Sequence, residues 1–132
     1  MSDNLALTEQ LYALSGAGDW DGVRAMVTED FFITEAPGLP FGGEYRGPDA
    51  LRDLYGKVMG MMAVTGLDLT EMTVGGDWVI ALVEMQAEDA DGTFSIPLAE
   101  AIRFRDGKAA EIKPYYFDPA LVHRAVAAKA NA

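Results

Sequence analysis

The stretch SIPLAEAIRFRDGKAAEIKPYYFD, residues 95–118, predicts a β-hairpin. Apolar side chains alternate along its first run, from Ile96 to Phe104, which is typical of a strand with one buried face. The segment RDG at 105–107 has the chemistry of a tight turn, and a second alternating run follows it. Glu100 shares the alternation of the apolar residues, so the pattern places a carboxylate on the face that should be buried.

Alternation with a period of two also precedes this hairpin and predicts a series of antiparallel strands. We expect strands at 67–74, 78–88, 94–105 and 109–117, separated by turn sequences at 75–77, 89–92 and 105–107. Nearer the N-terminus, the segment FFITEA at 31–36 has strand composition. The segment at 37–47 contains four glycines and two prolines, and it is predicted to be an ordered loop.

Helical spacing of apolar residues dominates the N-terminal half of the chain. It predicts helices at 4–16, from Trp20 to Val27 after an Asp19 N-cap, and from Pro48 to Met62, with a final helix at 119–129. Helices followed by a run of antiparallel strands are typical of an α+β domain, in which the helices pack on one face of a curved sheet. The chain is long enough for a single such domain, residues 1–132, to bury its own core.

The composition excludes several classes of partner. The 132 residues carry a formal net charge of −11, which argues against nucleic acid and anionic membrane surfaces, since both are bound through lysine and arginine. No apolar run is long enough to span a membrane, and the start MSDNLALTEQ lacks the basic residues of a secretory signal. There is no cysteine, and the single histidine, His123, is too little for a histidine-based metal site. We expect a cytoplasmic protein without a metal.

A second glutamate repeats the placement of Glu100. In the strand predicted at 31–36, Phe31, Ile33 and Glu35 share one face. Two interpretations stay open at this point. Each carboxylate could lie at the rim of the sheet or form a structural ion pair with a basic residue, the candidates being Arg46, Arg103 and Lys113. Alternatively, both could enter a cavity between the sheet and the helices.

The cavity interpretation has a chemical consequence. Burial in apolar surroundings raises the pKa of a carboxyl group toward neutrality, so the group can act as a general base or acid near pH 7. Two carboxyl groups in different surroundings can divide these roles, one as an ionised base and the other as a protonated hydrogen-bond donor. Tyr116, on one face of the last strand with Ile112 and Pro114, could donate a further hydrogen bond in the pocket.

Three segments carry a resemblance to a known family. They are LYALSGAGDWDGVRAMVTEDFFITEAPG at 11–38, YRGPDALRDLY at 45–55 and PLAEAIRFRDGKAAEIKPYYFD at 97–118. With their order along the chain, they resemble the NTF2-like superfamily, and within it the ketosteroid isomerase and SnoaL-like branch. The resemblance covers nearly the whole chain. It implies a cone-shaped, cystatin-like α+β fold and a homodimer formed through the open face of the sheet.

The resemblance also implies roles for individual residues. Glu35 falls where ketosteroid isomerases keep their aspartate general base, and Glu100 falls where they keep the protonated aspartate of the oxyanion hole. Their oxyanion-hole tyrosine would fall at Leu11, and Tyr12 lies one position away. Relatives similar to limonene epoxide hydrolase would have an arginine at Leu98. Dehydratases of this fold rely on an aspartate and histidine pair, which the lone histidine does not match.

Together these features predict cofactor-independent acid/base chemistry on a small apolar carbonyl compound, of the isomerase or cyclase type. Glu35 would abstract a proton alpha to the carbonyl, and Glu100 would stabilise the enolate, with Tyr116 or Tyr12 as a second donor. The substrate pocket is expected to be lined by Leu11, Tyr55, Val58, Met62, Ile102 and Ile112. The alternative is a non-enzymatic small-molecule-binding or dimerisation module of the same fold.

Overall fold

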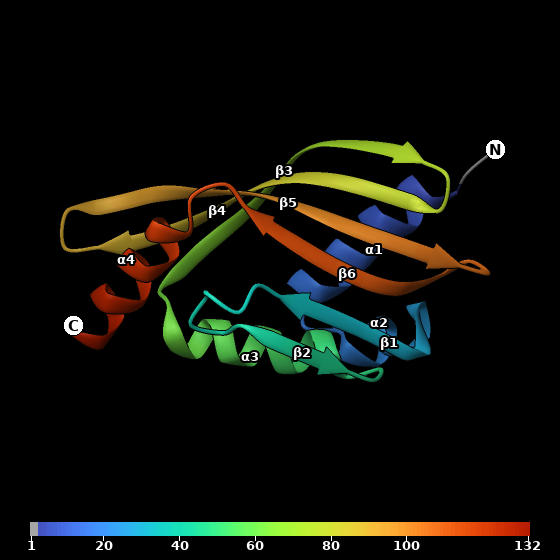
Figure 1. Cartoon of the computed structure of the whole chain (residues 1–132), viewed down its shortest axis with the longest axis horizontal. Coiled ribbons are helices and arrows are strands. Elements are labelled where there is room, and N and C mark those ends of the chain that lie inside the picture. Colours follow the sequence, from blue (N-terminus) through green and yellow to red (C-terminus); the bar gives the residue numbers. More distant parts are fainter. Residues whose placement is uncertain (1–2) are drawn as a thin grey trace.

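The computed structural model describes residues 3–132 and shows helices packed against a curved sheet (Figure 1). The helices are α1 (Asn4–Gly16), α2 (Trp20–Met26), α3 (Ala50–Met61) and α4 (Pro119–Ala130). The strands are β1 (Val27–Glu35), β2 (Gly43–Arg46), β3 (Val64–Gly75), β4 (Trp78–Asp89), β5 (Gly92–Arg105) and β6 (Lys108–Tyr116). This architecture is the α+β cone expected from the sequence.

The six described strands form one sheet in the order β2-β1-β6-β5-β4-β3. Strands β3 to β6 follow one another as antiparallel neighbours, as the alternation and the turn sequences predict. Strand β1 departs from the expected antiparallel arrangement, because it pairs in parallel with β6. A turn sequence predicts the relative direction only of two strands that it connects directly. Most of the chain separates β1 from β6, so no turn sequence predicts the direction of this pair.

A short strand lies within the segment expected to be a loop. Residues 43–46 form β2 and pair with residues 32–35 of β1. The loop prediction is wrong for these residues: the surrounding glycines and prolines dominate the local pattern, whereas the pairing with β1 is a tertiary contact. Strand β1 also begins at Val27, earlier than predicted, and its pairing with β6 is irregular between Val27 and Phe32.

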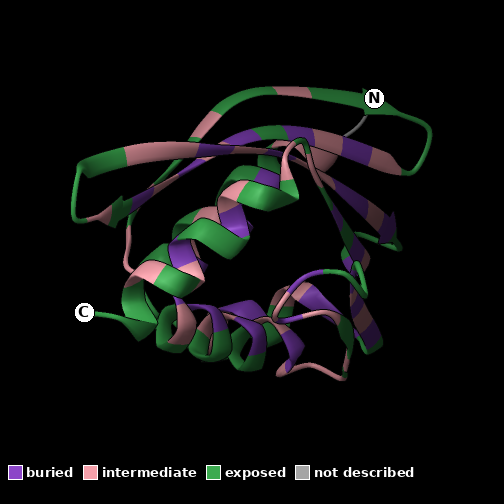
Figure 2. Cartoon of the chain, turned by 60° about the vertical axis from the view of Figure 1, so that its left-hand side comes forward, coloured by how far each residue is buried: buried purple, intermediate pink, exposed green. Residues whose placement is uncertain are grey.

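The core lies between the sheet and the helices. Buried positions alternate with intermediate and exposed ones along the strands and recur along the helices (Figure 2), and they form one core cluster that draws on both layers. The largest fully buried side chains include Phe31, Ile33, Phe41, Ile96 and Ile102. Burying each of them contributes about 1.5–3 kcal/mol relative to leaving it exposed. No helix within residues 3–132 is long and apolar enough to cross a bilayer.

Helix α4 is anchored at the end of the sheet where β4 turns into β5 (Figure 1). Arg124 of this helix forms an ion pair with Asp89 at 2.6 Å, and its guanidinium group lies 3.9 Å from the centre of the Phe94 ring. Val122, on the same helix, is fully buried. Helix α4 therefore closes the core at this end of the sheet.

A compact turn connects β1 to β2 and lies directly after Glu35. Its backbone is held by hydrogen bonds from the Leu39 N–H to the Ala36 carbonyl oxygen and from the Gly42 N–H to the Leu39 carbonyl oxygen. A Cβ atom on Gly42 would lie 2.4 Å from the Ala36 oxygen, closer than real Cβ atoms approach other atoms. Gly42 therefore permits a close backbone approach that a side chain would prevent.

Replacing Gly42 with alanine is expected to lower the free energy of unfolding by about 1–3 kcal/mol, since the added methyl group overpacks this turn. The matched control is Gly38→Ala in the same turn, because a Cβ on Gly38 meets no atom within 4 Å. Urea unfolding followed by circular dichroism measures both variants. Equal stability of the two would contradict the role assigned to Gly42.

Candidate active site

A cavity of about 400 Å³ lies between the sheet and helices α1 and α3. This volume falls within the range of small-molecule sites, about 300–1,000 Å³. Its wall is mainly apolar and draws on both layers of the fold. The lining residues with polar side chains are Tyr12, Ser15, Glu35, Tyr55, Thr65, Glu100 and Tyr116.

The structure brings together most of the residues that the sequence analysis assigns to the pocket. Those that line the cavity are Leu11, Tyr12, Glu35, Tyr55, Val58, Glu100, Ile102, Ile112 and Tyr116. Met62 is not among the lining residues and is buried in the core instead. Helical spacing places Met62 on the inner face of α3, but the helix ends at Met61 and the backbone of Met62 is extended.

The cavity also has walls that the sequence analysis does not assign. Leu98 lies two residues before Glu100 on the same face of β5, so the alternation along the strand predicts its position in the wall. Leu54 lies one helical turn before Val58, so the helical spacing of α3 predicts its position in the same way. The first part of β3, from residue 64 to 69, forms a further wall. The alternation predicts a strand from residue 67 but not its place in the cavity wall, because no residue of β3 is buried.

Strand β1 places Glu35 in the cavity wall. Phe31 and Ile33, on the same face of the strand, are fully buried, and the Glu35 residue is only 2 % exposed. The Oε1 atom of Glu35 is buried without a hydrogen-bond partner among the described residues. Burial is the main cause that raises the pKa of Glu35 to about 8, and repulsion by Glu100 adds to the rise when Glu100 is ionised. Glu35 therefore changes its charge near physiological pH.

Strand β5 places Glu100 in the same cavity. Glu100 pairs with Ala81 of β4 and with Pro114 of β6, so it lies in the interior of the sheet. Its Oε1 atom accepts a hydrogen bond from the Tyr12 hydroxyl on α1. Burial raises the pKa of Glu100, and the Tyr12 hydrogen bond partly opposes this rise. The net effect favours the protonated carboxyl group.

The basic residues considered as ion-pair partners of these two glutamates lie elsewhere. Arg46 and Arg103 form ion pairs with other glutamates, at 3.0 Å and 3.1 Å. The amino group of Lys113 lies 5.8 Å from the centre of a tyrosine ring. No lysine or arginine within residues 3–132 lines the cavity. The ion-pair interpretation is therefore wrong for these three candidates, and the cavity interpretation remains.

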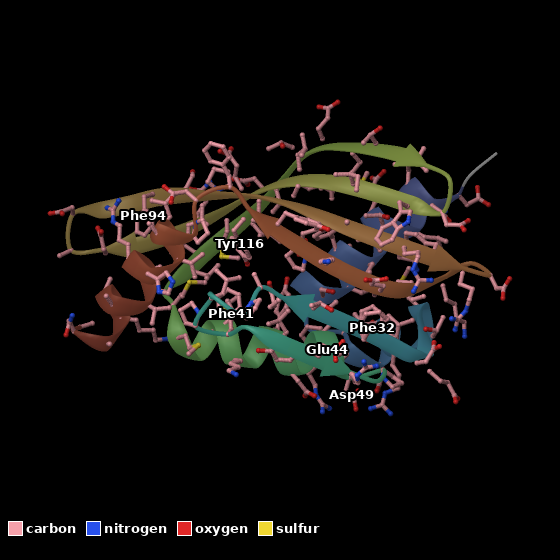
Figure 3. The ribbon with its side chains drawn as sticks, viewed as in Figure 1. Phe32, Phe41, Glu44, Asp49, Phe94 and Tyr116 are labelled. Carbon is pink, nitrogen blue, oxygen red and sulfur yellow. The ribbon has the colours of Figure 1, made fainter. Side chains whose placement is uncertain are left out.

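Three tyrosines enter the cavity from different elements: Tyr12 from α1, Tyr55 from α3 and Tyr116 from β6. Burial raises the pKa of all three hydroxyl groups, and nearby glutamates add to the rise. Tyr116 and Phe41 point toward each other in Figure 3, with ring centres 6.0 Å apart. The Tyr12 hydroxyl is engaged by Glu100, whereas the Tyr116 hydroxyl has no hydrogen-bond partner within residues 3–132.

The groups that the cavity offers to a ligand are carboxyl, phenol and aliphatic hydroxyl groups, which donate hydrogen bonds, and the carboxyl groups can also transfer protons. In the described part of the chain, no three histidine, cysteine, aspartate or glutamate side chains come together as a metal site would require. His123 lies outside the cavity, where its Nε2 atom is 3.0 Å from the Gly38 carbonyl oxygen.

The curved sheet, the helices over it and the cavity between the two layers define an NTF2-like α+β cone. The structure is similar to an NTF2-like protein from Burkholderia xenovorans LB400, at 25 % identity and a TM-score of 0.80, over 94 % of this chain and 95 % of that chain. It is also similar to TerC co-crystallised with polyporic acid, at 20 % identity and a TM-score of 0.79, over 96 % of this chain and 99 % of that one. A third similar structure is a protein with a ketosteroid isomerase-like fold from Catenulispora acidiphila DSM 44928, in complex with trimethylamine. It shares 16 % identity at a TM-score of 0.66, over 86 % of this chain and 85 % of that one.

The sequence profile of the SnoaL-like domain matches residues 8–112. The chain therefore belongs to the SnoaL-like domain family, and the resemblance seen in the sequence is confirmed. Comparison with curated protein sequences gives no match.

The raised pKa of Glu35 predicts a pH dependence of stability. In the unfolded chain this carboxyl group ionises near its ordinary pKa of 4.5, and in the folded protein it ionises near 8. Between these values the unfolded chain has lost a proton that the folded protein still holds. The contribution of Glu35 to the free energy of unfolding should therefore fall as the pH rises from about 5 to 8 and level off above that.

Replacing Glu35 with glutamine removes this titration. The variant should gain stability relative to the wild-type protein at about pH 9 and differ little from it at about pH 5. Glu29→Gln is the matched control, since Glu29 is exposed on the same strand. Urea unfolding at the two pH values measures the effect. A Glu35→Gln variant whose stability follows the wild-type pH dependence would contradict the raised pKa.

Proposed function

We propose that this chain catalyses proton transfer at a carbon alpha to the carbonyl group of a small, mostly apolar compound. The observation that carries the proposal is the pair of carboxyl groups, Glu35 and Glu100, in one apolar cavity without a basic partner among the described residues. A base whose pKa is about 8 and an acid held in its protonated form are the two groups that this reaction needs.

The reaction balances within the substrate. Ionised Glu35 takes the alpha proton, and the electron pair of the C–H bond moves so that the carbonyl oxygen becomes an enolate oxygen. Protonated Glu100 donates a hydrogen bond to that oxygen and stabilises its charge. Return of the proton to a different carbon gives an isomer. Attack of the enolate carbon on a second carbonyl of the same molecule, whose oxygen then takes the proton, gives a ring. Neither route needs an oxidant or a cofactor, because no electrons leave the substrate.

The tyrosines divide the remaining roles. The Tyr12 hydroxyl donates to Oε1 of Glu100, which leaves the Oε2 atom of Glu100 to carry the proton. We therefore assign Tyr12 as a positioning residue. Tyr116 lines the cavity with a hydroxyl that has no partner within residues 3–132, and it is the second donor to the enolate oxygen.

Ligands of similar structures support a small organic molecule as the occupant of this cavity. TerC was co-crystallised with polyporic acid, and the protein from Catenulispora acidiphila was solved in complex with trimethylamine. The lack of cysteine in the chain suits the reducing cytoplasm, where we place the reaction.

Exchange of the alpha protons of 2-tetralone for deuterium, followed by NMR in D2O, tests the proposal without knowledge of the natural substrate. The wild-type protein should accelerate exchange over buffer. Glu35→Gln should reduce this acceleration by about 100-fold or more, the usual contribution of a general base. The wild-type rate should rise with pH and level off above about pH 8, because Glu35 must be ionised to act.

Glu29→Gln serves again as the control, since it makes the same change at an exposed position of β1. Exchange by the Glu35→Gln variant at the wild-type rate would contradict the role of Glu35 as the base. Binding of 2-tetralone without any exchange would favour the non-enzymatic small-molecule-binding module.

We also propose that the outer face of the sheet joins two copies of the chain. Leu82, Ala99 and Tyr115 lie opposite one another on β4, β5 and β6, and Leu82 and Tyr115 are exposed. Phe117, just beyond β6, is 85 % exposed and borders a groove along the same row. Contiguous exposed apolar side chains mark interaction surfaces, and a second copy can cover this one with the same surface about a twofold axis.

Leu82→Glu is expected to convert this dimer to a monomer, because the new carboxylate would be buried unpaired at the interface. Val74→Glu is the matched control, since Val74 is an exposed apolar residue of β3 outside this row. Size-exclusion chromatography with light scattering measures the mass. A wild-type mass equal to that of one chain would contradict the proposed dimer.

A further inference from the structure

Among the described residues, the wall of the cavity contains acidic groups and no basic group. Glu35 and Glu100 are the carboxyl groups in its wall, and no lysine or arginine of the described chain contributes to that wall. Arg46, Arg103 and Arg124 each form an ion pair with a carboxylate outside the cavity. The negative charge of an ionised carboxylate in this cavity is therefore neutralised by a bound proton or by a positively charged ligand.

Glu35 has an unused hydrogen-bond acceptor. It is 2 % exposed, and its Oε1 atom has no partner among residues 3–132. A buried acceptor without a partner is costly, so a donor is normally provided by the protein, by water or by a ligand. The carbonyl oxygen of a ligand cannot be this donor, because it only accepts hydrogen bonds. An N–H group can.

The rest of the wall suits an organic cation rather than a bare metal ion. Tyr12, Tyr55 and Tyr116 line the cavity, and the face of an aromatic ring attracts a positive charge. Aliphatic side chains such as Leu98 and Ile102 suit a hydrocarbon body. The net charge of −11 attracts cations to the protein and repels anions.

We propose that the cavity binds hydrophobic amines in their protonated form, with the ammonium N–H directed at Glu35 and the hydrocarbon against the aliphatic wall. These amines are a second class of ligand for the cavity, and their binding does not depend on the proposed proton transfer. The ammonium group keeps its proton, and Glu35 gives its own proton to the solvent, so that a carboxylate–ammonium pair forms. The other titratable groups in the cavity wall, Glu100, Tyr12, Tyr55 and Tyr116, supply no competing positive charge.

Isothermal titration calorimetry with three probes of similar shape tests this proposal. The probes are 2-phenylethylamine, 2-phenylethanol and 3-phenylpropanoate, which are positive, neutral and negative near pH 7. The wild-type protein should bind the amine at least about tenfold more tightly than the alcohol, the gain expected from a charged hydrogen bond, and should not bind 3-phenylpropanoate measurably. Titrations in phosphate and in Tris should show release of about one proton with the amine and none with the alcohol.

Glu35→Gln should weaken amine binding by about tenfold and leave alcohol binding unchanged, and Glu29→Gln should change neither. The proton-release measurement uses the wild-type protein, so it decides the question even if the Glu35 variant does not fold. Lack of amine binding, equal affinity for amine and alcohol, or binding of the amine without proton release would overturn the proposal. Calorimetry needs no turnover, so amine binding and proton transfer can fail independently.

Discussion

The hydrogen bond from the Tyr12 hydroxyl to Glu100 joins the helical layer to the interior of the sheet. Glu100 is paired on both sides, with Ala81 and Pro114, so the strand ladder rather than a loop sets its position. Tyr12 reaches it from α1 and thereby fixes which side of that helix faces the cavity. A buried carboxyl group without a partner would oppose the packing of the two layers, because removing it from water costs several kcal/mol. The hydrogen bond from Tyr12 offsets part of this desolvation cost, and it also orients α1 relative to the sheet.

The two glutamates differ because the fold gives them different neighbours. Glu100 has a tyrosine donor and lies between two strands, whereas Glu35 ends β1, pairs with Gly43 of β2 and has no donor for its Oε1 atom among the described residues. The carboxyl group that is held in place is suited to donate a hydrogen bond of fixed direction. The carboxyl group without a donor is suited to gain and lose a proton as a ligand arrives. One cavity thus presents two chemically distinct acids.

Local patterns predict much of this site. Alternation along β1 and β5 gives the faces of Glu35 and Glu100, because a strand turns successive side chains to opposite sides. Helical spacing predicts the inner face of α3 and fails at Met62, where the chain leaves the helix. Local patterns do not predict strand β2 or the parallel pairing of β1 with β6, because both depend on segments that meet only in the folded chain. The same holds for the Tyr12 bond, because helical spacing gives a direction but not the distance from α1 to the sheet.

The parallel pairing of β1 with β6 places Ile33 beside Ile112, although the two residues come from opposite ends of the chain. Bringing such distant segments together costs chain entropy before any contact offsets it, so pairings of this kind slow folding. During synthesis, β1 leaves the ribosome long before β6 has been made. Until then the nascent chain exposes the apolar face that carries Glu35, and a fragment that stops before β6 lacks one wall of the cavity. The wall of the cavity is complete only after β6, which carries Ile112 and Tyr116, has been translated and has paired with its neighbours.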